Sequence, residues 1–325
     1  MTGRERLMKT LDLERVGGHV PHFEISMFLT MESLGRVHPK HRNYAQWNQM
    51  SMNEKKLTFE DMADVYAQIA EKYEYDAIFV NYLFPDIRDQ LEFLDVIRER
   101  TNGQYMILTH GDATYAIPDG NQLEEFSYRL ADEPELLKQE AGRMVDEAVK
   151  TAEIYERSGI LDGFILCSDY CFNTGPFLSP AMFGEFVTPY LKRLIRSYRE
   201  MGFYTIKHTD GNIMPVIDQL AEAGPHALHS LDPQAGIDIG QVKKLYGSRM
   251  CLMGNVNCGL MQTGTEKEVR ESALYSLKQG MSDGKGYIFS TSNCVYTGMP
   301  LERYELIVDL WKKYGVYQSR EQEEV

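Results

Sequence analysis

The sequence lacks the features that mark membrane-spanning and secreted proteins. No stretch of it approaches the about 20 consecutive apolar residues that a membrane span requires. The first seven residues are charged and helix-forming, so we expect no secretory signal there. Cysteine is scarce, and the five cysteines, an odd number without regular spacing, do not form a disulfide framework. Reduced thiols of this kind suit a cytosolic protein, and we therefore expect a cytoplasmic location.

Basic residues are also under-represented. The chain has 34 lysines and arginines against 48 aspartates and glutamates, which gives a net charge of −14. An acidic protein is poorly suited to bind nucleic acid or an anionic membrane, so we predict neither as a partner. No linker, low-complexity tract or short repeat divides the 325 residues, and a single domain spanning 1–325 is expected. Only the polar tail, residues 318–325, is predicted to be frayed.

What the sequence contains is an alternation of strand-like and helix-like segments, repeated eight times. Residues 134–155, for example, carry apolar side chains at three- and four-residue spacing, as in an amphipathic helix. A second helix is predicted from Ser179 and Pro180 to about Met201, where Gly202 ends it. Thr265 to Glu268 forms a capping box that starts a third. The predicted strands are residues 19–25, 76–81, 105–111, 163–169, 203–211, 227–233, 250–257 and 287–293.

Eight such units in about 300 residues favour an α/β fold of the (β/α)₈ TIM barrel type. A doubly wound open sheet is the structural alternative. That fold usually carries a glycine-rich dinucleotide fingerprint after its first strand, but Pro21 and His22 lie inside the first strand instead. The longest connection, residues 26–75, is predicted to form a helical excursion over the mouth of the barrel.

Polar or ionisable side chains stand at the end of every predicted strand, where barrel enzymes carry their chemistry. The most informative strand ends in His208 and Asp210, two residues apart, so both side chains leave it on the same side. Any one of these groups could merely cap the next helix, and for Asp232 and Asn255 that interpretation is equally good. The strand-end residues are Glu24, Asn81, His110 with Asp112, Asp169, His208 with Asp210, Asp232, Asn255, and Asn293 with Cys294.

We predict catalytic roles for Glu24, Asp169, His208 and Asp210. A metal would hold several such groups together, and His208, Asp210 and Cys294 offer zinc a nitrogen, an oxygen and a sulfur ligand with open positions. The alternative is an imidazole that acts alone as an acid or hydrogen-bond donor. The other four cysteines are interpreted as packed or loop thiols.

Aromatic and methionine side chains gather around the same strand ends, which suggests a pocket for a flat, apolar ligand. No arginine lies among the strand-end residues, so a polyanionic substrate would be poorly served. The aromatic and methionine residues are Phe23, Met27, Phe28, Tyr82, Phe84, Tyr115, Tyr170, Phe172, Tyr296 and Met299. The predicted substrate-binding residues are Asn81, His110, Asp112, Tyr115, Tyr170, Phe172, Asn255 and Tyr296.

Several segments resemble the uroporphyrinogen decarboxylase superfamily, which includes the decarboxylases and the cobalamin-dependent methyltransferases. The resemblance covers nearly the whole chain and implies a (β/α)₈ barrel. It is carried by Thr2-Gly-Arg-Glu-Arg-Leu with Val20-Pro21, Leu178-Ser-Pro-Ala-Met-Phe-Gly-Glu-Phe-Val-Thr-Pro-Tyr-Leu-Lys192, His208-Thr-Asp-Gly211, Gly254-Asn-Val256 and Thr297-Gly-Met-Pro-Leu-Glu302.

The chain departs from the decarboxylases at two points. They carry an Arg-Gln-Ala-Gly-Arg motif after the first strand, where this chain has Glu24-Ile-Ser-Met-Phe-Leu-Thr30. Their aspartate at the end of the second strand is matched here by Asn81. A tetracarboxylate bound without arginines would leave charges unpaired.

The methyltransferase branch fits better. Its zinc enzymes have His-x-Cys at the end of the fifth strand and a later cysteine at the eighth. This chain keeps His208, replaces the first cysteine by Asp210, and has Asn293 beside Cys294 at the later position. A shift of one residue would restore a thiolate there.

The resemblance therefore implies a methyltransferase that takes a methyl group from a small donor, most simply a methoxylated aromatic. The acceptor would be the cob(I)alamin of a separate corrinoid protein, because no corrinoid-binding domain is visible in the chain. His208 and Asp210, with or without zinc, would stabilise the departing oxygen, while Glu24 and Asp169 orient ligands or donate a proton. Two alternatives remain: a metal-dependent lyase or hydrolase acting on a small carboxylate, and a non-catalytic tetrapyrrole carrier. Assembly as a homodimer is left open.

Overall fold

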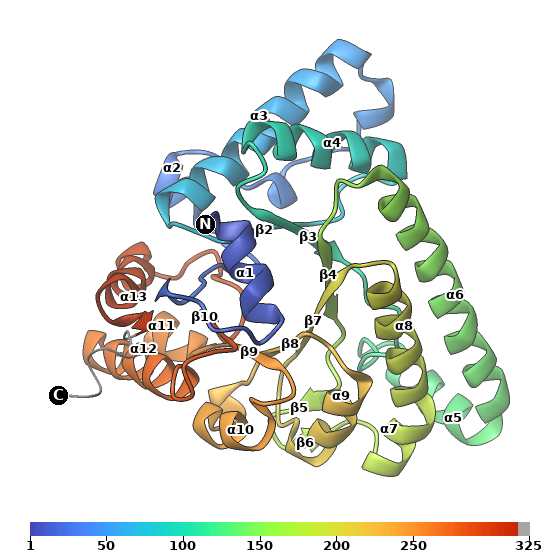
Figure 1. Cartoon of the computed structure of the whole chain (residues 1–325). Helices are drawn as coiled ribbons and strands as arrows, with labels where there is room; N and C mark the ends of the chain where they lie inside the picture. Colours follow the sequence, from blue (N-terminus) through green and yellow to red (C-terminus); the bar gives the residue numbers. More distant parts are fainter. Residues whose placement is uncertain (318–325) are drawn as a thin grey trace.

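The computed structural model describes residues 1–317, and the predicted tail lies outside the described residues. A curled parallel sheet of seven strands forms its centre, in the order β10-β9-β8-β7-β4-β3-β2 (Figure 1). Each strand corresponds to one of the predicted strands. They are β2 (Ala77–Val80), β3 (Met106–His110), β4 (Gly163–Cys167), β7 (Tyr204–Thr209), β8 (Ala227–Ser230), β9 (Cys251–Val256) and β10 (Tyr287–Thr291).

The segment predicted as the first strand fills the gap between β10 and β2, but not as a regular strand. Only Gly18–His19 form β1, which pairs antiparallel with β11 (Val316–Tyr317). Farther along, the amide of Phe289 donates to the Pro21 carbonyl at 2.9 Å, and the amide of Asp76 donates to the His22 carbonyl at 2.8 Å. Pro21 has no N–H to continue a ladder. The barrel is therefore closed by an irregular eighth segment, and the predicted (β/α)₈ fold is confirmed.

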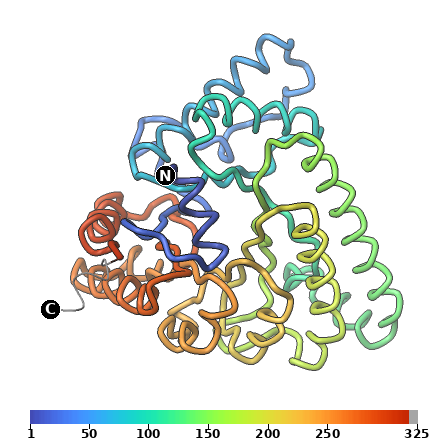
Figure 2. The backbone as a smooth tube through the Cα atoms, in the orientation of Figure 1, coloured from blue at the N-terminus to red at the C-terminus, as the bar shows by residue number. Residues whose placement is uncertain are grey.

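Helices surround the sheet, and the chain runs once around the ring, so that its last barrel units return beside the first (Figure 2). The long connection of residues 26–75 holds a helical excursion, as predicted, made of α2, two 3₁₀ helices (Pro39–His41 and Trp47–Gln49) and α3. The helices are α1 (Gly3–Leu11), α2 (Thr30–Leu34), α3 (Met52–Lys72), α4 (Ile87–Arg100), α5 (Leu123–Asp132), α6 (Pro134–Ser158), α7 (Pro180–Phe186), α8 (Thr188–Glu200), α9 (Ile217–Ala223), α10 (Ile239–Tyr246), α11 (Cys258–Thr263), α12 (Glu266–Gly280) and α13 (Leu301–Tyr314).

Local sequence explains where several helices start and stop. The Thr265 side chain accepts from the Glu268 amide in the predicted capping box of α12. The helix predicted from Ser179 to Met201 is instead two helices, α7 and α8, with a break at Val187. Pro189 accounts for the break, because it has no N–H to donate to the previous turn and its ring clashes with the carbonyl four residues earlier, whereas proline is tolerated in the first turn of a new helix.

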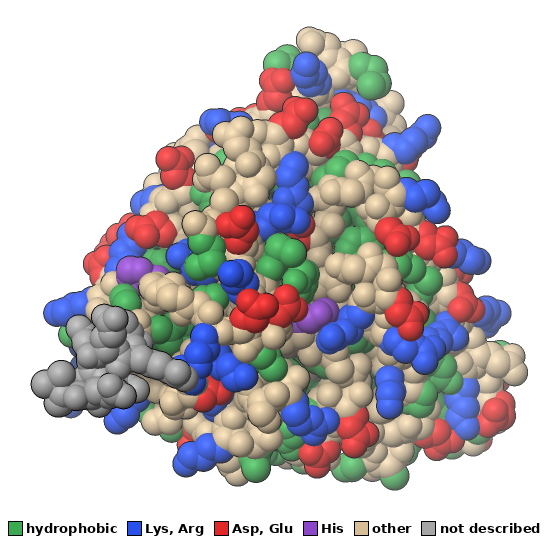
Figure 3. All heavy atoms as spheres, viewed as in Figure 1, with side chains coloured by type: hydrophobic (Ala, Val, Ile, Leu, Met, Phe, Trp, Pro, Cys, Tyr) green, Lys and Arg blue, Asp and Glu red, His purple; other side chains and the backbone are tan. Residues whose placement is uncertain are grey.

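Helix α1 lies across the end of the barrel where the strands begin, which faces the viewer in Figure 1. Arg4 on this helix pairs with Asp162 at 2.7 Å, and Arg6 pairs with Asp76 at 2.7 Å. The same face carries acidic and basic side chains intermingled (Figure 3). Within residues 1–317, no helix is both long enough and apolar enough to cross a membrane. With this end covered, the opposite end of the strands is the open mouth.

Candidate active site

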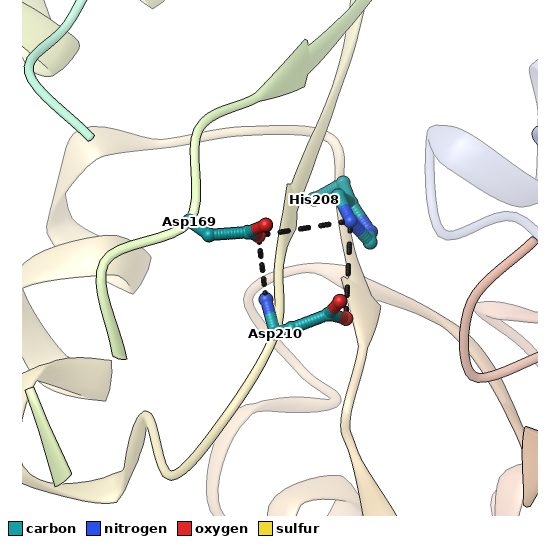
Figure 4. A group of neighbouring side chains, drawn as sticks. All are labelled: Asp169, His208 and Asp210. Carbon is teal, nitrogen blue, oxygen red and sulfur yellow. Dashed lines mark hydrogen bonds and ion pairs between the residues drawn. The ribbon is translucent and has the colours of Figure 1, made fainter. Parts of the chain in front are cut away.

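Asp169, His208 and Asp210 meet at the mouth, where β4 and β7 end (Figure 4). The His208 Nε2 atom lies 3.8 Å from Asp169 Oδ1 and 3.8 Å from Asp210 Oδ1. The Asp210 amide also donates to Asp169 Oδ1 at 3.0 Å. The parallel pairing of Cys167 with His208 places the ends of the two strands side by side. The two-residue spacing of His208 and Asp210 then points both side chains to the same place.

A second histidine, His229 on β8, contacts the other nitrogen of the His208 ring. Their Nδ1 atoms are 2.7 Å apart, and His229 Nε2 lies 3.0 Å from the Thr291 carbonyl oxygen. His229 is fully buried, and burial together with His208 lowers its pKa well below the usual value, so it is neutral. Because a carbonyl only accepts, the single proton of neutral His229 is on Nε2. His208 Nδ1 must then be the donor between the rings.

This assignment leaves the lone pair of neutral His208 on Nε2, the atom that faces the two carboxylates. Burial is the main reason that the pKa of His208 is lowered to about 4, so the ring is neutral at pH 7. The hydrogen bond that His208 Nδ1 donates to His229 thus fixes the tautomer in which Nε2 is a ligand atom, as histidines that bind metals require.

The two carboxylates differ in their surroundings. Asp169 is half exposed, whereas Asp210 Oδ1 is buried and has no hydrogen-bond partner within the described residues. The other Asp210 oxygen accepts from the Asn293 side chain. Burial, followed by the nearby charges of Asp169 and Asp232, raises the pKa of Asp210 to about 7. A lone pair facing two acceptor oxygens is a repulsive arrangement that a cation between them would relieve. One nitrogen and two oxygens with open positions suit zinc.

Cys294, predicted as the third metal ligand, does not belong to this group. Within residues 1–317 the cluster of neighbouring ligand atoms consists of Asp169, His208 and Asp210. The adjacent residue, Asn293, reaches the cluster instead through its bond to Asp210. Burial raises the pKa of the Cys294 thiol, which does not favour a thiolate. A ligand role for Cys294 stays a prediction.

Glu24 lies inside the barrel rather than at the metal-ligand cluster. Its carboxyl group accepts from the Thr291 hydroxyl at 2.6 Å and from the Thr291 amide at 3.1 Å. Burial raises the pKa of Glu24 to about 8, so it is mostly protonated at neutral pH. Thr291 also bonds His229, and Glu24 is therefore linked to His208 through Thr291 and His229. Glu24 borders a small internal cavity of about 30 Å³ together with His38 and Tyr66.

Four of the predicted substrate-binding residues are occupied by bonds within the protein. Asp112 pairs with Lys207 at 2.7 Å and accepts from Thr114. The Tyr170 hydroxyl bonds the same threonine. The Tyr115 hydroxyl donates to the Leu137 carbonyl at 3.0 Å. Asn255 donates to the Leu231 carbonyl at 2.7 Å and accepts from Ser276 at 3.0 Å. These bonds fasten the loops of the mouth, so contact with a substrate stays a prediction for these residues.

The other four keep free surface or free polar atoms. Phe172 is half exposed and Tyr296 is partly buried. The Asn81 amide nitrogen is buried without a partner, and the His110 ring makes no hydrogen bond within the described part of the chain. Contact with a ligand stays a prediction for these four residues as well.

Lys207 is a residue that sequence reasoning missed. It is fully buried, and besides Asp112 its ammonium group donates to the carbonyls of Leu166 and Ser168, at 3.1 and 3.0 Å. The second of these carbonyls directly precedes Asp169, so Lys207 holds the loop that carries this carboxylate. A lysine among apolar strand residues, next to His208, was the available signal.

Comparison with known proteins places the chain in a family. The uroporphyrinogen decarboxylase (URO-D) family profile matches residues 133–314, more than half of the chain. The protein belongs to this family. A uroporphyrinogen decarboxylase from Thioalkalivibrio sulfidiphilus (strain HL-EbGR7) is 25% identical over 254 residues, which cover 71% of this chain and 67% of the relative.

A solved structure shares the whole fold. A methyltransferase from Methanosarcina mazei superposes with a TM-score of 0.72, covering 97% of this chain and 99% of the other at 19% identity. At that identity the likeness establishes the barrel fold, and function has to be argued from the site.

Proposed function

We propose that this protein is a methyltransferase that moves a methyl group from a small donor, most simply a methoxylated aromatic, to the cob(I)alamin of a separate corrinoid protein. The observation that carries the proposal is the His208 Nε2 lone pair, 3.8 Å from two carboxylate oxygens, one of which is buried without a partner. Membership of the URO-D family and the shared fold with a methyltransferase support it. We place the reaction in the cytoplasm.

The residues at the mouth fit a zinc ion, since the donor set is one imidazole nitrogen and two carboxylate oxygens. His208, Asp169 and Asp210 would hold it. When bound, zinc supplies Lewis-acid stabilisation of the negative charge on a departing oxygen. Cys294 is a further ligand only if its segment shifts.

The surrounding residues prepare these ligands. His229 fixes the His208 tautomer, and Asn293 holds one oxygen of Asp210 while leaving the other free. Lys207 anchors the chain next to Asp169. Glu24, mostly neutral at pH 7, bonds Thr291 and so supports the histidine pair without adding a charge to the barrel interior.

An ether oxygen is a poor leaving group unless its developing charge is stabilised. The cob(I)alamin of the partner is the nucleophile, so this chain needs to supply only binding, orientation and charge stabilisation at the oxygen. Asp169 is half exposed at the mouth, which lets the donor approach the cluster from the side where the corrinoid protein docks.

Decarboxylation of uroporphyrinogen is less well supported. The segment from Glu24 to Thr30 carries no arginine, and Asn81 replaces the carboxylate expected at the end of the second strand. Each unpaired substrate carboxylate would lose its hydration without compensation.

The test follows the visible spectrum of a reduced corrinoid protein mixed with this protein and a panel of methyl ethers, methylamines and methyl thiols. We expect conversion of cob(I)alamin to methylcobalamin with ethers, and release of the free phenol. His208→Ala should abolish the conversion. Transfer from thiols or amines alone would reject ether specificity, and decarboxylation of uroporphyrinogen would overturn the proposal.

A further inference from the structure

The mouth has a basic side that the proposed reaction does not use. Lys40 lies in the 3₁₀ helix Pro39–His41 of the excursion, with its ammonium group 5.4 Å from the centre of the Phe28 ring. His38 and His41 pack on the same ring, at 5.0 and 4.7 Å between ring centres. The Phe28 amide donates to the Val295 carbonyl at 2.9 Å. This contact places the Lys40 group beside the residues that follow β10, next to Cys294.

Lys40 makes no ion pair with any carboxylate in residues 1–317, although its basic neighbours do. Arg36 and Arg42, from the same loop, both pair with Asp61. The charge of Lys40 reaches the mouth of the barrel. Burial is the main reason that the pKa of His110 is lowered to about 4, and the positive charge of Lys40 lowers it further. An ammonium group held near a strand end without a counter-ion is available to an anion from solution.

Two more donors without acceptors lie at the ends of the adjacent strands. The register of β2 and β3 pairs Val80 with Thr109, so Asn81 and His110 come next to each other as the strands end. The Asn81 side chain is only 3% exposed, and its amide nitrogen has no partner. The Phe79 ring packs against the His110 ring at 4.7 Å and keeps it in place. A buried N–H without an acceptor is rare in a folded protein and calls for a ligand atom.

The carboxylates gather on the other side of the mouth. Asp169, Asp210 and Asp232 follow β4, β7 and β8, and after burial the charges of Asp169 and Asp232 help to raise the pKa of Asp210. The mouth is therefore polarised, with acidic groups around His208 and, on the other side, free donors at the ends of β2 and β3 and the ammonium group of Lys40, whose charge acts on His110. A ligand that matches this pattern has an anionic group at one end and its reactive group at the other.

We infer that the methyl donor carries an anionic group, most simply a carboxylate, which binds Lys40, His110 and Asn81 while the methoxy group faces His208. The inference rests on the proposed function for the identity of the reactive group, but the anion site is defined by its own donors. An ammonium ion, an imidazole N–H and an amide N–H are donors that each match an acceptor site of a carboxylate.

The first experiment measures binding without any reaction, by titration calorimetry with para-methoxybenzoate and its neutral isostere para-methoxybenzamide. We expect the carboxylate to bind at least about tenfold more tightly than the amide, because charge-assisted hydrogen bonds are the stronger kind. Lys40→Met should remove that preference, while Lys40→Arg should retain most of it. Lys56→Met, which removes an exposed lysine from α3, is the matched control and should behave as wild type.

Equal binding of the acid and the amide, or a preference that survives in Lys40→Met, would overturn the inference. That result would assign Lys40 to another role, such as contact with an acidic surface of a protein partner.

The second experiment separates this inference from the proposed function by following methyl transfer to the corrinoid protein with both compounds. Transfer from the amide as fast as from the acid, unaffected by Lys40→Met, would leave the methyltransferase proposal standing and reject the anionic donor. Lys40-dependent binding of the acid without any methyl transfer would support the anion site and reject the proposed reaction. Lys40-dependent binding and transfer together would support both.

Discussion

Aspartate side chains at the two ends of the barrel differ in how completely their hydrogen-bonding capacity is used. Where the strands begin, Asp162 accepts from Arg4 at 2.7 Å, from Arg98 at 2.8 Å and from the Ile107 amide at 2.8 Å. Asp76 likewise binds Arg6 and the His22 amide. Where the strands end, Asp210 has one buried oxygen without a partner and faces the lone pair of a neutral histidine.

This difference shows which carboxylates serve the fold. A buried charge is tolerated when its hydrogen-bonding capacity is used, as it is for Asp162. One oxygen of Asp210 has no hydrogen-bond partner within the described residues. Lys207, the residue before His208, pairs with Asp112, which shows that the same strand can carry a cationic partner for a carboxylate. An incomplete carboxylate at the mouth of a barrel indicates a site that is completed by a ligand.

The largest expected effect comes from removing the carboxylate of Asp210 at the mouth. Asp210→Asn should reduce methyl transfer by about 1,000-fold, because the amide is a poor metal ligand and no longer balances positive charge. Its folding stability should stay the same or rise, since a buried, incompletely paired carboxylate is removed. Transfer rates and thermal unfolding measure the two effects. Asp146→Asn, on the exposed face of α6, is the control, and a loss of stability in Asp210→Asn without loss of transfer would contradict the comparison.

The opposite result is expected at the covered end. Asp162→Asn should lower the free energy of unfolding by about 3 kcal/mol, because it leaves Arg4 and Arg98 without their shared partner. The folded fraction should keep its rate of methyl transfer. Chemical denaturation gives the first quantity and transfer assays below the unfolding transition give the second. An intact stability would show that the arginine pairs are not what holds α1 on the barrel.

A smaller effect is expected at His229, which contacts His208 but is not itself part of the metal-ligand cluster. His229→Asn should weaken zinc binding by about 10- to 100-fold, because it removes the group that fixes the His208 tautomer. Zinc affinity can be measured by competition with a chromophoric chelator, independently of any catalysis. His226→Asn is the matched control, since His226 lies on the same unit but at the start of β8. Unchanged affinity in His229→Asn would reject the tautomer argument.

The last prediction concerns the pH dependence of stability. The pKa of Glu24 is about 8 in the folded protein, above its ordinary value of 4.5, so between these pH values the folded state holds a proton that the unfolded state has released. Its contribution to stability is complete below pH 4.5 and is lost as the pH rises toward 8, with a slope of at most about 1.4 kcal/mol per pH unit. Glu24→Gln should flatten the measured slope, whereas the exposed Glu147→Gln should not. A steeper slope in Glu24→Gln would contradict the burial of a protonated carboxyl.

Sequence reasoning predicted what depends on local periodicity. The two-residue spacing of His208 and Asp210 places both at the mouth wherever β7 lies, and the helix periods predict the ring around the sheet. It could not supply the register between strands, which pairs His208 with His229. It also could not predict that Lys207, on the other side of β7, reaches Asp112, because that contact joins residues far apart in the chain.

The remaining differences have local physical causes. Pro21 prevents a regular first strand, and Pro189 divides a predicted helix. Strand β10 ends at Thr291, so side-chain alternation no longer decides whether Asn293 or Cys294 faces the mouth. The loop geometry brings the asparagine to Asp210.

The central claim, that His208, Asp169 and Asp210 at the mouth bind a cation, is tested most directly by elemental analysis. Wild-type protein and Asp162→Asn, purified without chelator, should each contain about one zinc ion per chain. His208→Ala and Asp210→Asn, folded to the same extent, should contain almost none. Wild-type protein without a stoichiometric transition metal, or zinc that survives the loss of His208, would contradict the account.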